Sequence, residues 1–221
     1  MAMNAISIGS LINSRLTEQP KPDLLTDDLN VKLAAYKKLD PVVARVAADI
    51  EAVQKNTSLS NDGQQKAIAA LGTKAVPAFE WLARMRDQAI AAYTAMTHTL
   101  LDPLTTKPQG DPILIFLREQ ELRRTIPRDN SDTLFLRALE TDDLETCRAL
   151  LDAPGRSVIT DEIQQRGEEE YAKRTNAPVY AKRESKELLR DELMMLAGVI
   201  ASWLLSLGAD EAVVRTTLGG E

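Results

Sequence analysis

The side chains best suited to catalysis are scarce in this chain of 221 residues, which has one histidine, His98, and one cysteine, Cys147. A nucleophilic triad needs a base beside its nucleophile, and His98 is the only histidine that could act as one. His98 lies near the end of a helical pattern, where a histidine usually packs or faces solvent. One histidine and one cysteine also cannot supply the four ligands of a zinc site. We therefore predict no catalytic residue, no metal ligand and no cofactor.

Carboxylates are plentiful and could in principle hold Mg²⁺ or Ca²⁺. Acidic clusters occur at Asp142-Asp143 and at 168–170, but neither has the spacing of a calcium-binding loop. A helix cap explains the first cluster better, and a solvated helix face explains the second. The chain also has no glycine-rich phosphate loop and no Rossmann fingerprint. An enzyme that uses carboxylates and a divalent metal stays open as an alternative.

Basic residues form two patches that could contact a partner or a nucleic acid. The first patch contains Arg118, Arg123, Arg124 and Arg128, and the second contains Lys173, Arg174, Lys182, Arg183, Lys186 and Arg190. Tyr171 and Tyr180 lie within the second patch, and such mixtures can hold phosphates and stack on bases. Carboxylates are interleaved with both patches, and the formal net charge is −6. This balance favours pairing with carboxylates of neighbouring helices or subunits over broad nucleic-acid binding.

The composition and the hydrophobic pattern predict an all-α multi-helix bundle. Hydrophobic residues are 44% of the chain and aromatic residues only 4%, which suits closely packed helices better than a β-sandwich. The longest pattern, from about Ser60 to Leu101, has two apolar rows with seven-residue spacing, typical of a bundle or a short coiled coil. Pro77 interrupts this pattern, so we predict a long central helix with a kink between Gly72 and Pro77.

The predicted organisation has four parts. Residues 1–28 form an extended N-terminal arm, 29–102 a helical region with the kinked helix, 103–112 a linker with prolines and Gly110, and 113–221 a C-terminal helical region that starts at the capping pair Asp111-Pro112. The apolar side chains of the arm are Ile6, Ile8, Leu11 and Ile12. Two interpretations of the arm are open: it lies across a neighbouring subunit, or it packs on its own domain.

The last long helix, from about Ser185 to Leu207, is apolar around most of its circumference, so we expect both of its faces to be covered. Its uncharged run, Leu193 to Leu207, is shorter than the roughly 20 residues that span a membrane. The N-terminus has no basic segment of the kind that begins a signal peptide. We therefore expect a protein without a membrane span, located in the cytoplasm or in a particle assembled there.

One stretch of the chain has a recognisable arrangement of helices, turns and prolines. It runs from Leu134 to Arg190 and contains Ala138-Leu139-Glu140-Thr141-Asp142-Asp143-Leu144-Glu145, then Ala149-Leu150-Leu151-Asp152-Ala153-Pro154, and later Asn176-Ala177-Pro178. This stretch resembles small all-helical proteins of unassigned role from the structural gene clusters of tailed bacteriophages. The resemblance covers about a quarter of the chain and transfers no catalytic or cofactor residue. It implies a virion or assembly role, as a neck or tail adaptor, a capsid-associated protein or an internal protein.

Together these observations predict a non-enzymatic structural protein that acts through helix faces and the arm. Its expected partners are further copies of the chain, other subunits of a larger assembly, or both. A second hypothesis is a regulatory module whose acidic surface occupies the basic cleft of a host or nucleic-acid enzyme.

Overall fold

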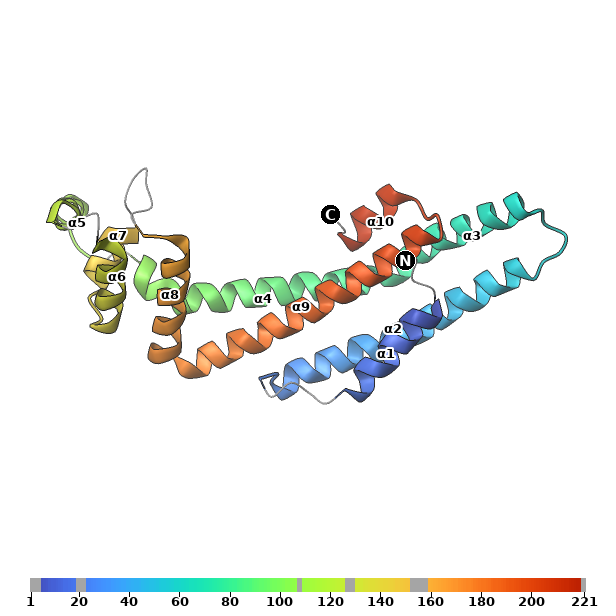
Figure 1. Cartoon of the computed structure of the whole chain (residues 1–221), viewed down its shortest axis with the longest axis horizontal. Coiled ribbons are helices and arrows are strands. Elements are labelled where there is room, and N and C mark those ends of the chain that lie inside the picture. Colours follow the sequence, from blue (N-terminus) through green and yellow to red (C-terminus); the bar gives the residue numbers. More distant parts are fainter. Residues whose placement is uncertain (1–4, 19–22, 107–108, 126–129, 152–158, 220–221) are drawn as a thin grey trace. The chain divides into compact units, whose positions relative to one another are not determined.

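The computed structural model describes residues 5–18, 23–106, 109–125, 130–151 and 159–219, which are almost entirely helical (Figure 1). The helices are α1 (Ala5–Thr17), α2 (Thr26–Gln54), α3 (Asn61–Ala75), the 3₁₀ turn η1 (Val76–Phe79), α4 (Glu80–Thr105), α5 (Pro112–Thr125), α6 (Ser131–Glu140), α7 (Leu144–Leu151), α8 (Asp161–Thr175), α9 (Ala177–Ser206) and α10 (Glu211–Leu218). No strand occurs in these ranges, so the predicted all-α class is confirmed.

The contacts within the chain divide it into two compact units. The first contains residues 1–93 and 184–221, and the second contains residues 94–183. The predicted linker at 103–112 therefore lies inside the second unit instead of between domains. The predicted region 113–221 is also divided, because the C-terminal part of α9 packs in one hydrophobic core with α2.

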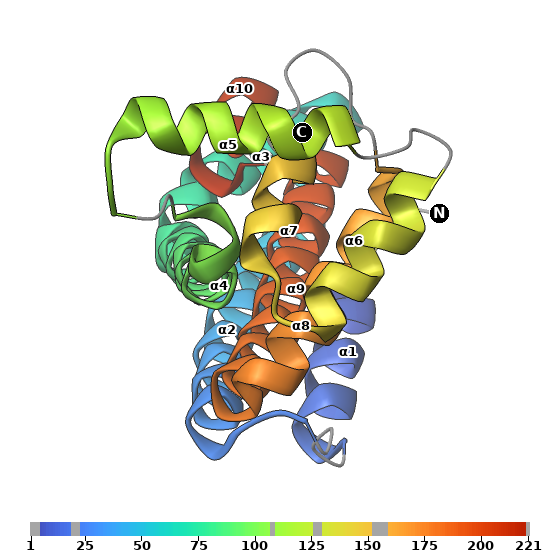
Figure 2. The same ribbon diagram turned by 90° about the vertical axis from the view of Figure 1, so that its left-hand side faces the viewer.

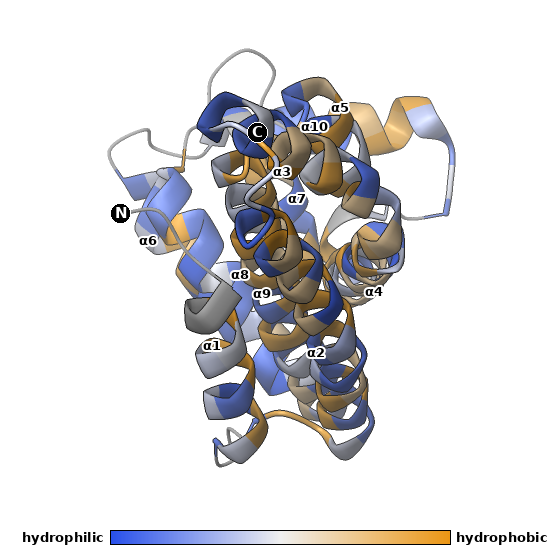
Figure 3. Ribbon diagram, turned by 90° about the vertical axis from the view of Figure 1, so that its right-hand side faces the viewer, coloured by the Kyte–Doolittle hydropathy of each residue, from blue (hydrophilic) through white to orange (hydrophobic). Residues whose placement is uncertain are grey.

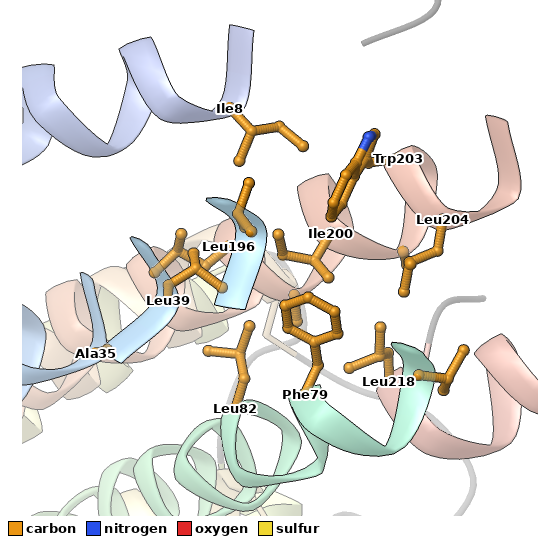
Figure 4. Close-up of a cluster of buried hydrophobic side chains, with 14 of the residues drawn as sticks. Ile8, Ala35, Leu39, Phe79, Leu82, Leu196, Ile200, Trp203, Leu204 and Leu218 are labelled. Atoms are coloured by element: carbon orange, nitrogen blue, oxygen red, sulfur yellow. The ribbon is translucent and has the colours of Figure 1, made fainter. Parts of the chain in front are cut away.

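The core of the first unit collects side chains from α1, α2, η1, α4, α9 and α10 (Figure 4). Phe79 of η1 lies among Leu82, Ile200 and Leu218 in this view. Its ring meets that of Trp203 edge to face, with centroids 6.5 Å apart and an interplanar angle of 83°. This geometry is one that aromatic pairs prefer. Segments more than 100 residues apart in the sequence are thus joined by a common apolar interior.

The helix α9 buries one apolar face but not both. Leu193, Ile200 and Trp203 are almost fully buried, whereas Met194 is 49% and Leu205 38% exposed. The prediction that both faces of this helix are covered is therefore wrong within the described chain, because its neighbours lie on one side of it. None of the described helices is both long and apolar enough to cross a membrane.

Residues 5–17 form the helix α1, so the predicted extended arm is not confirmed. Ile8 and Ile12 are buried in the core of the first unit, and Leu11 is partly buried. Ile6 lies in α1, but its side chain is outside the described residues. The four-residue spacing of Ile8 and Ile12 puts both on one side of the helix, which suits packing on its own unit.

Pro77 interrupts the predicted long central helix, but not by bending one continuous helix. The helix α3 ends at Ala75, Val76–Phe79 form the 3₁₀ turn η1, and α4 begins at Glu80. The proline sits near the start of η1, where its missing N–H is least costly. The single kinked helix is therefore not confirmed. Two helices, α3 and α4, joined by the 3₁₀ turn η1 take its place.

The second unit has its own core, built mainly from side chains of α6, α7 and α8. These three helices are labelled in Figure 2. Phe135 and Leu139 of α6 pack with Cys147 and Leu150 of α7 and with Tyr171 of α8. This core includes α7, and α7 in turn contacts α5.

Candidate functional site

The helix α5 begins where the sequence predicts. The Asp111 side chain accepts a hydrogen bond from the Ile113 N–H at 2.8 Å, and Pro112 is the first helical residue. The carboxylate accepts from one otherwise unpaired N–H of the first turn, and the proline at the first helical position has no N–H to satisfy. The start of α5 is therefore well defined by local chemistry.

The first two turns of α5 expose a group of large apolar side chains. Ile113 is 67%, Leu114 64%, Phe116 53% and Leu117 54% exposed. Ile113 and Leu117 lie one turn apart on the helix, and Leu114 and Phe116 flank them on either side. In Figure 3 the corresponding part of α5 is coloured as hydrophobic. We call these four side chains the α5 face.

The opposite side of α5 packs against its own unit and includes a buried carboxylate. Glu119 is 5% exposed, and Ile115 and Leu122 are partly buried. A surface helix normally turns its apolar stripe inward and its charges outward. In α5 a carboxylate is turned inward while four apolar side chains face outward. A contiguous apolar group of this kind on a folded unit is typical of a surface that a partner covers.

Polar contacts attach α5 to α7. Arg118 pairs with Glu145 of α7, with Nε and Oε1 2.5 Å apart. Arg148 of α7 donates to the carbonyl groups of Pro103 and Thr106 at the end of α4, each at 3.3 Å, which attaches α7 to α4. A hollow of about 360 Å³ remains between α5 and α7. The α5 face is therefore presented by a helix that charged and polar contacts hold on a small support.

The first basic patch is only partly within the described residues. Arg118 and Arg124 are exposed on α5. The side chain of Arg123 and the whole of Arg128 lie outside the described residues, so the prediction that these four arginines form one patch stays a prediction. Arg118 is engaged with Glu145, as described above.

In the second basic patch, several cations contact carboxylates or rings of the same chain. Arg183 lies 3.6 Å from Glu169, and its guanidinium is 5.1 Å from the centre of the Tyr180 ring. Arg174 pairs with Asp142 at 2.9 Å, and this ion pair lowers the pKa of the Asp142 carboxyl. Lys182 is exposed. Much of the positive charge in this segment is thus balanced locally.

The two residues with catalytic potential lie in unrelated settings. Cys147 is fully buried in the second core, and burial raises the pKa of its thiol to about 12. Its reactive thiolate is therefore scarce near neutral pH. His98 is exposed on α4. Among the described residues, no group of three or more His, Cys, Asp or Glu side chains is placed to hold a metal ion.

The sequence reasoning missed a buried polar network in the first unit. Asp28 accepts from the Ser185 hydroxyl at 2.6 Å and from Lys186 at 2.5 Å, and Ser185 accepts from the Leu25 N–H at 2.9 Å. One turn further along α2, Nζ of Lys32 lies 3.6 Å from Oε2 of Glu192 in α9.

After another turn, the buried Tyr36 hydroxyl donates to the same Glu192. Burial and this hydrogen bond raise the pKa of Tyr36, which keeps its hydroxyl neutral. The four-residue spacing of Asp28, Lys32 and Tyr36 is the signal that could have revealed the network. Because its partners satisfy one another, it joins α2 to α9 and leaves no group directed at a ligand.

Comparisons of the chain with protein-family models, with curated proteins and with solved structures find no match.

Proposed function

We propose that this chain is a non-enzymatic structural protein that joins a larger assembly by burying the α5 face against a neighbouring protein subunit. The observation that carries the proposal is the outward exposure of Ile113, Leu114, Phe116 and Leu117 on one helix whose inner side holds a buried carboxylate.

The physical driving force is the removal of apolar surface from water. Each exposed side chain of this size gains about 1.5 to 3 kcal/mol when it is fully buried, so covering the α5 face offsets part of the entropy lost on association. The partners in this proposal are further copies of the chain or other subunits of the same assembly. The isolated apolar side chains elsewhere on the surface, such as Met194, offer no comparable gain.

Light scattering after size exclusion, over a wide range of protein concentration, tests the proposal. We expect the mass of the native chain to rise above the 24.4 kDa of one copy. The double variant Phe116→Ser/Leu117→Ser should remain at one copy, because its polar side chains remove the gain on burial. Met194→Ser, which changes an exposed apolar side chain on α9, is the matched control and should associate like the native chain.

A native chain that stays at one copy at every concentration, and that is also absent from the purified particles described below, would overturn the proposal. So would a double variant that associates as well as the native chain. Circular dichroism of the three proteins checks that all of them keep their helices.

The assembly that we propose is a bacteriophage particle, in which the chain is a neck or tail adaptor, a capsid-associated protein or an internal protein. The support for this part is the resemblance of residues 134–190 to helical proteins encoded among phage structural genes. Mass spectrometry of purified particles is the test. Peptides of this chain in the particles at constant stoichiometry would support the role, and their restriction to the unassembled fraction of the lysate would contradict it.

A further inference from the structure

We infer that α1 is an exchangeable helix, and that the surface of α2 and α9 on which it lies also binds α1 of a second copy of this chain. This inference rests on the proposed function, because it needs copies that an assembly brings together, and it adds one contact by which those copies are joined. Three features of α1 support it: its weak intrinsic stability, a binding surface whose charges remain paired without it, and contacts that can be repeated between copies.

The helix α1 has little stability of its own. Among its 13 residues, the strong helix formers are Ala5, Leu11, Arg15 and Leu16, and all the others are Ile, Ser, Asn, Thr or Gly. Isolated helices shorter than about 12 to 15 residues are marginal in water even when they are rich in alanine. The helical form of α1 therefore depends on the surface against which it packs.

The contacts of α1 with its unit are apolar along most of the helix and charged near its end. Ile8 is 1% and Ile12 0% exposed, and both belong to the core that includes side chains of α2 and α9. In Figure 4, Ile8 lies on the side of α1 that faces Leu196 of α9. Nε of Arg15 lies 3.7 Å from Oε1 of Glu192 in α9. We call the part of α2 and α9 that α1 covers, with Leu196 and Glu192, the α1-binding surface.

The charges of the α1-binding surface remain paired when α1 leaves. Oε2 of Glu192 lies 3.6 Å from Nζ of Lys32, and Glu192 also accepts from the Tyr36 hydroxyl; both of these partners belong to α2. Arg15 has its own ion pair with Glu18 at 2.7 Å, which moves with α1. Release of α1 therefore avoids the cost of about 3 to 5 kcal/mol that follows when one partner of a buried ion pair is removed and the other is left alone. What release costs is mainly the burial of the apolar side chains of α1.

Exchange between copies preserves the contacts of α1. Each α1-binding surface holds one α1 in either arrangement, so Ile8 and Ile12 are buried equally well within one copy and between two copies. Domain swapping of this kind is a low-cost route by which subunits join. Residues 18–25 connect α1 to α2, and a segment of that length spans at most about 29 Å. Copies whose α1-binding surfaces lie within this distance of each other's α2 can therefore exchange α1.

Zero-length cross-linking of isotopically mixed copies tests the exchange. Nζ of Lys32 lies 3.9 Å from Oε2 of Glu18, the residue after α1, so a carbodiimide can join these two side chains directly. Copies grown on ordinary nitrogen and on heavy nitrogen are mixed in equal amounts, unfolded in urea, refolded together at high concentration and cross-linked. Mass spectrometry then identifies mixed links, which join one light and one heavy peptide. We call the Glu18–Lys32 products the α1 links.

The ion pair between Lys186 of α9 and Asp28 of α2 supplies matched control links. Both of these helices stay in their own copy when only α1 exchanges, so the control links should not be mixed. We expect mixed α1 links to exceed mixed control links several-fold. About half of all α1 links is the limit for complete exchange between equal amounts of two labels.

A variant of the helix tests whether its apolar side holds it. Ile8→Ser/Ile12→Ser removes the buried apolar contacts of α1, so α1 links of both kinds should fall several-fold while the control links persist. Circular dichroism checks that the longer helices of the variant are retained. Unchanged α1 links in this variant would contradict the inference, because α1 would then be held by other contacts.

Three further results would overturn the exchange. If all α1 links lie within one copy, α1 stays on its own unit; multimers in light scattering would then leave the proposed function standing. Mixed control links as frequent as mixed α1 links would show that more of the chain than α1 is exchanged. An absence of α1 links of either kind, where control links form, would show that α1 does not lie on this surface. Failure of the proposed function is seen separately, by light scattering and in the purified particles.

Discussion

The helices α5 and α9 are both rich in large apolar residues, but the chain treats them in opposite ways. In α9, Leu193, Ile200 and Trp203 are buried against other helices of the first unit. In α5, the four side chains of the α5 face are directed to solvent, and only one side of the helix packs on its own unit. The difference lies in what covers each helix, because both have side chains of similar type and size.

This comparison shows that an apolar stripe indicates a need for burial without showing where that burial occurs. The stripe of α9 is covered by α1, α2 and η1 within one chain. The stripe of α5 has no such cover in the described residues, and the helix instead turns Glu119 inward. We propose that an assembly partner supplies the cover that α5 lacks within the described residues.

The largest expected effect comes from truncating a buried side chain of α9. Trp203→Ala should lower the free energy of unfolding by about 3 to 5 kcal/mol, because it removes a fully buried indole and its edge-to-face contact with Phe79. Phe116→Ala on the α5 face should change it by less than about 0.5 kcal/mol in the single-copy state. Urea unfolding followed by circular dichroism at low protein concentration measures both. Similar losses in the two variants would show that the α5 face is covered within the chain.

A smaller effect is expected in the polar network that joins α2 to α9. Asp28→Asn keeps the shape of the side chain but removes the charge that holds Lys186 and accepts from Ser185. We expect a loss of about 1.5 to 3 kcal/mol, the range for hydrogen bonds to charged groups.

The matched control for this change is Glu51→Gln on the same helix. It removes the charge from an ion pair with Lys55 in which both side chains are mostly exposed. No measurable change is expected there, because solvent screens the pair. If Asp28→Asn unfolds at the same urea concentration as the native chain, the network contributes nothing to the attachment of α9.

The sequence predicted the helices well and their environments less well. The pair Asp111-Pro112 identified the start of α5 because capping is local chemistry, whereas Pro77 lies in the 3₁₀ turn η1 and the predicted kink of one long helix is not confirmed. The side of α5 that faces solvent could not be predicted, since it depends on α7, whose Arg148 contacts Pro103 and Thr106, residues distant in the sequence. The helix α1 was missed because Ser7, Gly9 and Ser10 interrupt its apolar pattern, and only packing on its unit reveals the pairing of Ile8 with Ile12.

The smallest expected effect is on stability, and it comes from replacing two helical glycines. One is packed against neighbouring side chains and the other is not. A Cβ added at Gly167 of α8 would lie 2.6 Å from Leu139 Cδ1 and 2.9 Å from Phe135 Cε1, whereas one added at Gly198 of α9 would meet nothing within 4 Å. Alanine in a helix interior is favoured over glycine by roughly 0.5 to 1 kcal/mol. Gly198→Ala should therefore be slightly more stable than the native chain.

Gly167→Ala gains the same helix propensity but must displace two buried side chains, and overpacking of this type costs about 1 to 3 kcal/mol. The overpacking is the larger of the two effects, so we expect a net loss of about 1 kcal/mol. Paired thermal and urea unfolding of the two variants gives the difference directly. Equal stabilisation in both would mean that α6 and α8 approach less closely than Gly167 allows. A loss confined to Gly167→Ala would show that the second core is tightly packed. This core includes α7, the helix that contacts α5.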